Sequence, residues 1–361
     1  MKWLLYSGLG QGGAQRQLIT IANSLAQTHE VTLLTYDKSY QFYKVNDNVK
    51  IIELINRKIN KKLDKIISIF RIRKYLKRTD YKYVLSFITK MNVSMGFSLR
   101  LIPKKSKREK IFIASERSTN LIYEKSLAWK LLVSFSYKHF DYIAVNNTSN
   151  INKINDVIDF ELSNIRYLPN FIDLDDFPLL NISKAKSKKY IILIPARISP
   201  QKNQKIIIDL CLKYQLENTE FYLVGDDESN YASKLKDDIK KHKLEDKIKL
   251  IGKTANIIRL YKDCDLVLLP SLFEGFPNVI LESLAVGRIC LASKIEENKQ
   301  LIDHNVNGFL FDNNDVDSLY KSIMHIKSLD KKTLVTIANE GRKRILKYSD
   351  SRVERILMET F

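Results

Sequence analysis

The sequence has few of the residues that cross-link a chain or interrupt its regular structure. Its 361 residues include only three cysteines, Cys211, Cys264 and Cys290, without CxxC or His-paired zinc spacing. An odd number of widely spaced cysteines excludes a disulfide framework and favours a reducing, cytoplasmic compartment. Only 7 prolines and 11 glycines accompany a hydrophobic content of 45%, which is typical of ordinary folded domains and not of disordered or fibrous chains.

Long apolar runs are also missing. No stretch approaches the roughly 18 apolar residues that span a bilayer. The apolar run from Met1 to Tyr6 enters a glycine-rich stretch at once, so it is too short for the hydrophobic region of a signal peptide. We therefore expect a cytoplasmic protein that binds a membrane only peripherally, on its inner face.

Acidic residues are scarce relative to basic ones. The chain has 60 Lys and Arg against 41 Asp and Glu, a net charge of +19, which predicts an anionic partner such as nucleic acid, anionic lipid or a phosphorylated substrate. Basic residues are densest between 57 and 78, where ten of them accompany a single acid, Asp64. On a helix, four lysines of this segment share one face: Lys58, Lys61, Lys62 and Lys65. Apolar residues share another: Ile59, Leu63, Ile66, Ile67 and Phe70.

This basic segment has two interpretations that the sequence leaves open. One is a solvated surface helix that packs through its apolar face. The other is a helix that lies on anionic lipid and meets a lipid diphosphate, for which basic and apolar faces are both required. Nucleic acid is disfavoured because no aromatic platform or base-reading motif accompanies the charge.

Apolar strand patterns alternate with helical patterns along the whole chain, which predicts an α/β protein. The strands expected in the first half are Trp3 to Tyr6, 31–36, Val84 to Phe87, Ile111 to Ser115, Tyr142 to Val145 and Ile165 to Leu168. Those expected in the second half are Tyr190 to Pro195, Glu220 to Val224, Ile248 to Ile251, Leu266 to Pro270, Ile289 to Ala292 and Gly308 to Phe311. We predict two Rossmann-like, doubly wound parallel sheets.

The predicted domain boundaries follow from composition. A stretch rich in Pro, Asn, Asp, Ser and Lys separates the two halves. We assign residues 1–178 to an N-terminal domain, 179–189 to a linker and 190–345 to a C-terminal domain. Residues 346–361 are predicted to form a C-terminal helix that crosses back to the N-terminal domain.

A glycine-rich loop follows the first predicted strand. In "YSGLGQGGAQRQ", residues 6–17, Gly8, Gly10 and Gly13 have the spacing of a dinucleotide-binding fingerprint. Asp37, at the end of the second strand, is placed where an NAD-binding protein has its ribose-binding acid. The fingerprint alone therefore leaves a dehydrogenase open.

The segment "LVLLPSLFEGFPNVILESLAVG", residues 266–287, carries the strongest chemical pattern. A buried strand ends at Pro270, and Pro277 stands where a helix begins. Ligands of open α/β sheets bind beyond the carboxyl ends of strands, and a helix N-terminus there favours a phosphate. Glu274 and Glu282 are then placed to flank one ligand and accept hydrogen bonds from its hydroxyls.

Seven residues separate Glu274 from Glu282. This spacing resembles the E-x7-E motif of retaining GT-B glycosyltransferases of family GT4, and the motif stands here in the EGFPN form that is usual for that family. The resemblance implies two Rossmann-like domains that face a cleft. It also implies that Glu274 contacts the transferred sugar and that Glu282 holds the ribose of the nucleotide. The backbone around the sugar would come from four residues: Gly275, Phe276, Pro277 and Asn278.

Other segments resemble the same family. "IPARISPQKN" at 194–203 implies that Arg197 and Lys202 bind the donor diphosphate, two cations in place of a metal, so that no cofactor is required. "LVGDD" at 223–227 is similar to the family's second C-terminal turn, where Gly225 allows a close backbone approach. "GGAQRQL" implies that Gly12 and Gly13 face the donor phosphate and the acceptor. "PNFID" at 169–173 resembles the family's linker signature, with Phe171 in place of glycine.

Two segments depart from the family or compete with it. "ASERSTN" at 114–120 resembles the SER or SEH segment of polysaccharide transferases, but several relatives have a histidine where this chain has Arg117. Glu116 and Arg117 are therefore only candidate acceptor-side residues. "DCD" at 263–265 matches the metal-binding DxD of a different glycosyltransferase fold, and we interpret it as a helix-to-strand turn.

The resemblance implies transfer of a hexose or N-acetylhexosamine from a UDP- or GDP-sugar to a hydroxyl of an undecaprenyl diphosphate-linked glycan, with retention of configuration, in surface polysaccharide assembly. Two alternatives stay open: a GT-B sugar-nucleotide epimerase, which would need the donor alone, and a non-catalytic glycan-binding or scaffold subunit.

Overall fold

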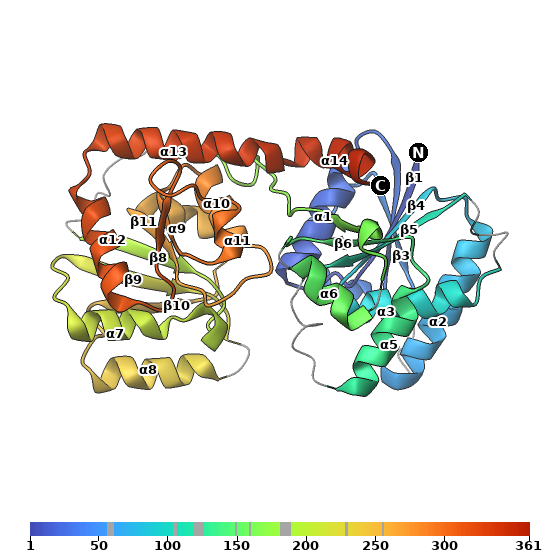
Figure 1. Ribbon diagram of the computed structural model, residues 1–361, viewed down its shortest axis with the longest axis horizontal. Helices are drawn as coiled ribbons and strands as arrows, with labels where there is room; N and C mark the ends of the chain where they lie inside the picture. The colour runs from blue at the N-terminus through green and yellow to red at the C-terminus, as the bar shows by residue number, and fades with distance from the viewer. Residues whose placement is uncertain are drawn as a thin grey trace. The chain divides into compact units, whose positions relative to one another are not determined.

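The computed structural model covers residues 1–361 and describes all of them except 56–60, 104–106, 108, 118–125, 149, 159, 181–188, 228–229 and 255. The described chain forms two compact units. Unit 1 consists of Met1–Ile172 together with Tyr348–Phe361, and unit 2 of Asp173–Lys347. Each unit contains one parallel β-sheet with helices on both faces (Figure 1).

The sheet of unit 1 has seven parallel strands in the order β3-β2-β1-β4-β5-β6-β7. Its strands are β1 (Lys2–Tyr6), β2 (Glu30–Thr35), β3 (Val49–Glu53), β4 (Tyr83–Phe87), β5 (Ile111–Glu116), β6 (Tyr142–Val145) and β7 (Ile165–Tyr167). Its helices are α1 (Gly13–Leu25), α2 (Lys61–Arg78), α3 (Thr89–Arg100), α5 (Leu127–Tyr137), α6 (Asn150–Ile158) and α14 (Val353–Thr360). Short 3-10 turns are η1 (Lys38–Tyr40), η3 (Leu162–Asn164) and η6 (Asp350–Arg352).

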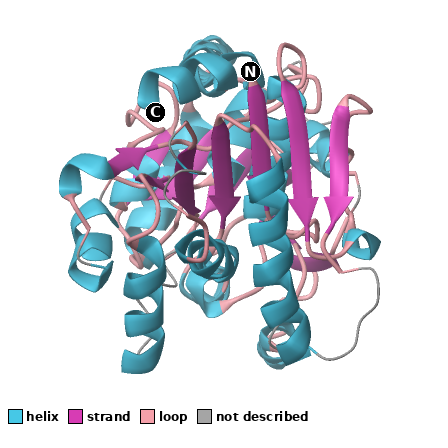
Figure 2. Cartoon of the chain, turned by 90° about the vertical axis from the view of Figure 1, so that its right-hand side faces the viewer, coloured by secondary structure: helices cyan, strands magenta, loops and turns pink. Residues whose placement is uncertain are grey.

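Both faces of the unit 1 sheet are covered, which explains the continuous apolar runs of its strands. Every residue of β4 is buried. Figure 2 shows the strands side by side between layers of helix. One core, with α2, α3, α5 and α6, covers one face, and a second core, with α1 and α14, covers the other.

Sequence reasoning missed one strand of this sheet. β3 pairs only with β2, at the edge, and three of its five residues are half-buried. An edge strand needs no continuous apolar run, so its sequence "VKIIE" gave a weak signal.

The C-terminal segment packs in unit 1. Ile172 forms a parallel bridge with Ser349, and Asp350 N–H donates to the Ile172 carbonyl at 2.9 Å. The Ser24 hydroxyl of α1 donates to the Asp350 carbonyl at 2.7 Å, and Thr28 donates to Glu354 of α14 at 2.7 Å. The chain therefore leaves unit 1 and returns to it at adjacent points.

The sheet of unit 2 has six parallel strands in the order β10-β9-β8-β11-β12-β13. Its strands are β8 (Tyr190–Pro195), β9 (Thr219–Val224), β10 (Ile248–Gly252), β11 (Leu266–Leu269), β12 (Cys290–Ser293) and β13 (Phe309–Phe311). Its helices are α7 (Lys205–Lys213), α8 (Tyr231–Lys241), α9 (Ile257–Asp263), α10 (Asn278–Ala285), α11 (Glu296–Lys299), α12 (Val316–Ser328) and α13 (Lys331–Ile345). Two 3-10 turns are η4 (Pro200–Lys202) and η5 (Leu346–Tyr348), the latter ending at the first residue of the returning segment.

The strand order reverses direction once in each sheet. In unit 1 the reversal lies between β1 and β4, and in unit 2 between β8 and β11. The predicted pair of doubly wound parallel sheets is thus confirmed. Loops at the carboxyl ends of the strands that flank such a reversal form the ligand-binding crevice of open α/β sheets.

Residues 177–180, between the two sheets in sequence, pack within unit 2. Leu180 N–H donates to the Val286 carbonyl at 3.0 Å, and the Arg342 guanidinium donates to the Phe177 carbonyl at 3.2 Å. Most of the predicted linker, 181–188, lies outside the described residues.

The basic segment forms α2 from Lys61 onward, and Lys58 lies outside the described residues. The backbones of Lys61, Lys62 and Lys65 are helical. The interpretation that this helix packs on the core through its apolar face does not hold for most of that face, of which Ile59 lies outside the described residues. Leu63, Ile66 and Phe70 are exposed, whereas the helix packs through a different set that includes Ile72 and Leu76.

Candidate active site

The two loops at the strand-order reversal of unit 2 carry opposite charges. Lys202 ends the η4 turn that follows β8, and Glu274 lies in the loop between β11 and α10. Since β8 and β11 are paired parallel neighbours, both loops leave the same edge of the sheet. The fold thereby places a lysine and a glutamate that are far apart in sequence at one point.

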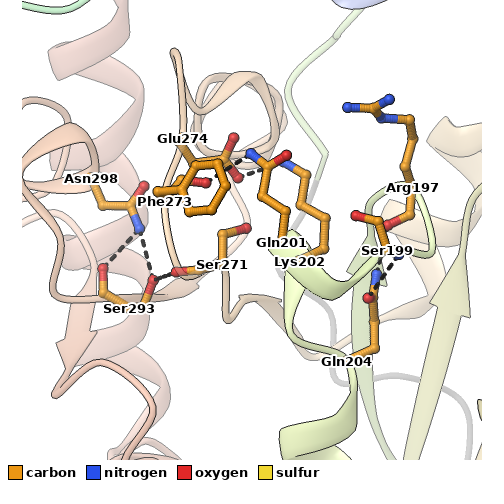
Figure 3. A network of polar contacts seen from close by, with 10 residues as sticks. All are labelled: Arg197, Ser199, Gln201, Lys202, Gln204, Ser271, Phe273, Glu274, Ser293 and Asn298. Carbon is orange, nitrogen blue, oxygen red and sulfur yellow. Dashed lines mark hydrogen bonds and ion pairs between the residues drawn. The ribbon is translucent and has the colours of Figure 1, made fainter. Parts of the chain in front are cut away.

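Lys202 and Glu274 form a buried ion pair (Figure 3). Lys202 Nζ lies 2.5 Å from Glu274 Oε1, and the two side chains are only 13% and 6% exposed. A charge with so little access to water is stable only beside an opposite charge or strong hydrogen-bond partners. The ammonium group therefore compensates the carboxylate and fixes its position.

Backbone contacts hold these two loops together. Leu272 N–H donates to the Gln201 carbonyl at 2.9 Å. The Gln201 side chain donates in return to the Phe273 carbonyl at 2.9 Å, as Figure 3 shows. Asn203, directly after Lys202, has a left-handed backbone with φ of 51°, which ends the η4 turn and starts the approach to α7. The ion pair thus lies on a rigid support.

A second network fixes the start of the Glu274 loop. The Ser293 hydroxyl, at the end of β12, donates to the Ser271 carbonyl at 2.5 Å. Asn298 donates to the Ser293 carbonyl at 2.7 Å (Figure 3). Sequence reasoning missed Gln201, Ser271, Ser293 and Asn298 because their partners come from other strands.

Arg197 is not brought to the ion pair. Its side chain is exposed and stands apart from Lys202 and Glu274 in Figure 3. Its carbonyl accepts a hydrogen bond of 2.7 Å from the Gln204 side chain. Gly225, at the end of the neighbouring β9, lies against the same loop, because a Cβ there would be 2.1 Å from the Ala196 carbonyl oxygen. Only glycine permits that approach.

The EGFPN residues form the entry to α10. Pro277 is the N-cap residue and Asn278 the first helical residue, as the proline predicted. Gly275 is half-buried, and Phe276 and Pro277 are buried. The positive end of α10 therefore begins four residues after Glu274, where it favours an anion.

Glu282, in α10, is held by a tyrosine. The Tyr261 hydroxyl of α9 donates to Glu282 Oε2 at 3.0 Å, and both residues are buried. Burial, together with the Glu282 charge, raises the pKa of Tyr261 well above its ordinary value, so the phenol keeps its proton and remains a donor. Arg288 Nε donates to the Tyr261 carbonyl at 2.6 Å. Sequence reasoning did not find Tyr261.

In unit 1, the glycine loop leads directly into α1. Gly12 is the N-cap residue and Gly13 the first helical residue. Further along α1, the buried Gln17 donates to the Phe171 carbonyl at 2.8 Å and accepts from the Phe171 N–H at 2.5 Å. This helix therefore fixes the last residues of the sheet domain before the chain passes to unit 2.

Glu116 is the last residue of β5 and is 1% exposed. It accepts hydrogen bonds from Thr89 at 2.9 Å, from Asn92 at 2.8 Å and from the Tyr137 hydroxyl. Burial raises the pKa of this carboxyl to about 7 against the effect of these donors. Ile88, which precedes Thr89, has a strained φ of 65° for a β-branched residue. This cluster fixes the carboxyl ends of β4 and β5.

Arg117 turns away from Glu116 toward the end of β7. Its guanidinium donates to the Leu168 carbonyl at 2.8 Å, the Pro169 carbonyl at 3.2 Å and the Asn170 side chain at 3.1 Å. Burial lowers the pKa of Arg117 to about 9. Glu116 and Arg117 are adjacent in sequence but bind different segments of unit 1. Their acceptor-side role stays a prediction.

The Asp263–Asp265 segment lies at the amino end of β11, between α9 and the strand. Asp265 accepts a hydrogen bond from the Ile191 N–H at 2.8 Å and donates its own N–H to the Ile191 carbonyl at 2.9 Å. The helix-to-strand turn is confirmed, at the opposite edge of the sheet from Glu274. Within the described ranges, no three His, Cys, Asp or Glu side chains gather as a metal site.

Family models match both halves of the chain. Residues 11–176 match the family described as "Glycosyltransferase Family 4", and residues 178–344 match "Glycosyl transferases group 1". Together the two matches include nearly every residue discussed above.

Two curated relatives match the chain, one along nearly its full length and the other along half of it. The chain is 27% identical, over 96% of its length and 94% of the relative's, to the GalNAc-alpha-(1->4)-GalNAc-alpha-(1->3)-diNAcBac-PP-undecaprenol alpha-1,4-N-acetyl-D-galactosaminyltransferase of Campylobacter jejuni. It is 30% identical, over 50% of its length and 49% of the relative's, to a UDP-Gal:alpha-D-GlcNAc-diphosphoundecaprenol alpha-1,3-galactosyltransferase of Escherichia coli.

Solved structures show the same fold. Anabaena Alr3699/HepE in complex with UDP-glucose superposes with a TM-score of 0.81 at 19% identity, over 99% of this chain and 98% of that one. Sucrose-phosphate synthase from Thermosynechococcus elongatus has a TM-score of 0.81 at 16% identity, over 99% and 97%. With two doubly wound sheets, an EGFPN loop and both family matches in the expected order, this chain belongs to the GT4-type glycosyltransferases of the GT-B fold.

Proposed function

We propose that this glycosyltransferase moves a hexose or N-acetylhexosamine from a nucleoside diphosphate sugar to a hydroxyl of an undecaprenyl diphosphate-linked glycan, with retention of anomeric configuration. The observation that carries the proposal is the buried Lys202–Glu274 pair at the strand-order reversal of unit 2. The bound UDP-glucose of the Anabaena structure supports the donor, and the names of the Campylobacter and Escherichia relatives support the acceptor.

The proposed step breaks the bond between the anomeric carbon and the β-phosphate oxygen, and the electron pair goes to that oxygen. Lys202 and the positive end of α10 stabilise the resulting negative charge. The acceptor oxygen forms its bond to the anomeric carbon on the face that the diphosphate leaves. The acceptor proton passes to the departing phosphate oxygen, so no separate base is needed.

Glu274 assists this step by position and charge. Its carboxylate is fixed by Lys202 and by the support of the loops, which suits a group that holds a sugar hydroxyl and stabilises positive charge on the sugar ring. Glu282 holds the ribose, and Tyr261 orients Glu282. Because a lysine and a helix terminus supply positive charge, we propose that transfer requires no metal ion, with Arg197 joining Lys202 on the diphosphate.

The proposal also includes a location. A lipid-linked acceptor requires the enzyme to work at a membrane, and we propose the inner face of the cell membrane. No helix among the described residues has the length and apolarity needed to cross a bilayer. Contact with the membrane is therefore assigned to the surface of the protein.

The decisive experiment is a donor screen. The purified protein is incubated with a panel of UDP- and GDP-sugars, with and without a polyprenyl diphosphate-linked N-acetylhexosamine acceptor, and the products are identified by mass spectrometry and NMR. We expect an acceptor-dependent product of unchanged anomeric configuration that forms equally well in excess EDTA, and that the Glu274→Gln variant forms about 10²–10³-fold more slowly.

Four outcomes contradict the proposal. An epimerised donor without acceptor would identify an epimerase. A product of inverted configuration would exclude the front-face path, and activity that EDTA abolishes and Mg²⁺ or Mn²⁺ restores would exclude the metal-free mechanism. Glycan binding without turnover of any donor would indicate a scaffold subunit.

A further inference from the structure

Helix α5 in unit 1 exposes most of its apolar side chains. Its sequence, "LAWKLLVSFSY", contains one charged residue, Lys130. One side of the helix is buried through Val133, Ser136 and Tyr137. On the other side Leu127 is 71% exposed, Leu131 63% and Phe135 42%. These three residues are spaced four apart, so they form one stripe along the helix.

A second apolar stripe lies on α2. Leu63, Ile66 and Phe70 are 50%, 53% and 57% exposed. Buried residues of α2, α3 and α5 belong to the same core cluster, so all three helices cover the same face of the sheet (Figure 1). Helix α3 packs against both of the others. Both stripes thus belong to the outer side of one helical layer.

The exposed charge on α2, α3 and α5 has one sign. Helix α2 carries eight basic residues, α3 two and α5 one, against a single acid, Asp64, which is 3% exposed. The exposed cations include Lys74, Lys77 and Arg100. The Arg100 guanidinium lies 5.1 Å from the centre of the Phe135 ring, so one cation directly borders the α5 stripe.

We infer that the α5 stripe inserts into the interfacial region of a bilayer of anionic lipids, while the cations of α2 and α3 contact the headgroups. Exposed leucines and phenylalanines bordered by basic residues meet the two requirements of interfacial membrane binding. A lysine-rich border favours lipid over a protein partner, because lysine is depleted at protein interfaces. This inference rests on the proposed function for its biological setting, but not for its test.

Two properties distinguish insertion by α5 from simple attraction by charge. Apolar contacts persist at high salt, whereas attraction between lysines and anionic headgroups is screened. Insertion also brings the position of Leu131 in the stripe close to the acyl chains, whereas Trp129 of α5 is half-buried and packs against the core. The chain has two tryptophans, and the other, Trp3, is completely buried in the sheet.

The experiment measures binding of the full chain to vesicles of phosphatidylglycerol and phosphatidylethanolamine by flotation, at 0.1 M and 0.5 M NaCl. Leu127→Gln with Leu131→Gln removes apolar contact without changing charge, and we expect at least a tenfold loss of binding at both salt concentrations. Lys74→Gln with Lys77→Gln should weaken binding mainly at the lower salt concentration. Leu212→Gln, at an exposed leucine of unit 2, is the matched control and should bind like the unchanged chain.

A fluorescence measurement tests the depth of α5. With Leu131→Trp as a reporter in the stripe, lipids brominated on the acyl chains should quench the added fluorescence, and Leu212→Trp, at an exposed position of unit 2, should show no such quenching. The inference is overturned if the Leu127→Gln, Leu131→Gln variant floats like the unchanged chain, or if the Leu131→Trp reporter is quenched no more than the Leu212→Trp reporter. It is also overturned if sedimentation shows a dimer that the Leu127→Gln, Leu131→Gln variant dissociates, since the stripe would then contact a second copy.

Failure here and failure of the proposed function are distinguishable. A protein that transfers sugar to a water-soluble acceptor but does not bind vesicles contradicts only the membrane inference. A protein that binds vesicles through α5 but transfers no sugar from any donor contradicts only the proposed function.

Discussion

The two sheets bury a glutamate near the carboxyl ends of their strands, but they give it opposite partners. In unit 2, Glu274 lies 2.5 Å from the ammonium group of Lys202. In unit 1, Glu116 accepts hydrogen bonds from neutral groups of Thr89, Asn92 and Tyr137. The two sheets share a strand-order reversal, so topology does not explain the difference.

The comparison teaches that burial alone does not specify what a carboxylate does. A carboxylate beside a cation remains charged at little cost, and its partner can also attract a phosphate. A carboxylate among neutral donors lacks charge compensation, so burial favours its protonated form. The first arrangement suits a site for an anionic ligand, and the second suits a junction that holds strand ends together.

Breaking the pair in unit 2 should have the largest effect. Lys202→Met leaves Glu274 as an uncompensated buried charge, so we expect the free energy of unfolding to fall by about 3–5 kcal/mol. Adding Glu274→Gln should recover most of the lost stability. Chemical denaturation of both single variants and of the double variant would measure this recovery. The control is Lys205→Met, which breaks an exposed pair with Asp209. Equal stability of the two lysine variants would show that the buried pair contributes no more to the free energy of unfolding than the exposed pair does.

Glu274→Gln keeps the shape of the side chain and removes its charge. Since the carboxylate is proposed to stabilise developing positive charge, turnover should fall by about 10²–10³-fold, with little change in donor affinity. Stopped assays with the best donor of the screen give the rate, and intact-protein mass spectrometry should detect no glycosyl adduct on Glu274 in the unchanged chain. A stable adduct would mean double displacement instead of front-face attack.

Glu116 should make stability depend on pH. Its pKa is about 7 in the fold against an ordinary value of 4.5. Below pH 4.5 the carboxyl is protonated in both states. Between these values the unfolded chain releases a proton that the fold retains, so stability falls as pH rises, and above pH 7 the loss is complete. The total loss is at most about 3 kcal/mol.

Glu116→Gln removes this dependence. The fixed cost of placing an amide among the donors is the same at every pH, so only the difference between pH 5 and pH 8 is diagnostic. We expect the unchanged chain to lose stability over this range by more than the variant does, as measured by denaturant unfolding. Parallel curves for the two proteins would contradict the assignment of this titration to Glu116.

The smallest expected effect concerns Tyr261. Tyr261→Phe removes the hydrogen bond that orients Glu282, and we expect affinity for the parent nucleoside diphosphate to fall about three- to tenfold, which is roughly 1 kcal/mol. Calorimetry with the 2′,3′-dideoxy nucleoside diphosphate should give the same affinity for Tyr261→Phe and for the unchanged chain, because that ligand lacks the hydroxyls that Glu282 is proposed to hold. Tyr214→Phe, which removes a hydroxyl that donates to the exposed Asp317, is the control.

Glu282→Ala gives the upper limit for this contact. Loss of a charged acceptor for the ribose should weaken nucleotide binding by about 1.5–3 kcal/mol. If Tyr261→Phe weakens both the normal and the dideoxy ligand equally, the tyrosine acts through general packing and not through Glu282.

Much of the fold could be predicted because strand signals are local. Apolar runs such as Tyr190 to Pro195 are buried on both faces, so their pattern alone indicates a parallel strand. The edge strand β3 was missed because it lacks such a run. The EGFPN loop could be found because proline and glycine fix its backbone, whereas Tyr261 could not, since its contact with Glu282 joins α9 to α10.

By itself, the sequence determined the alternation of strands and helices, the two sheets and the residues of the EGFPN loop, because apolar periodicity and turn chemistry act between near neighbours. Only the tertiary structure decided that Lys202 compensates Glu274, that Glu116 is buried among neutral donors, and that the apolar stripe of α2 is exposed. Each depends on which strands pair and which helix covers them, and strand order is set by the packing of the whole unit.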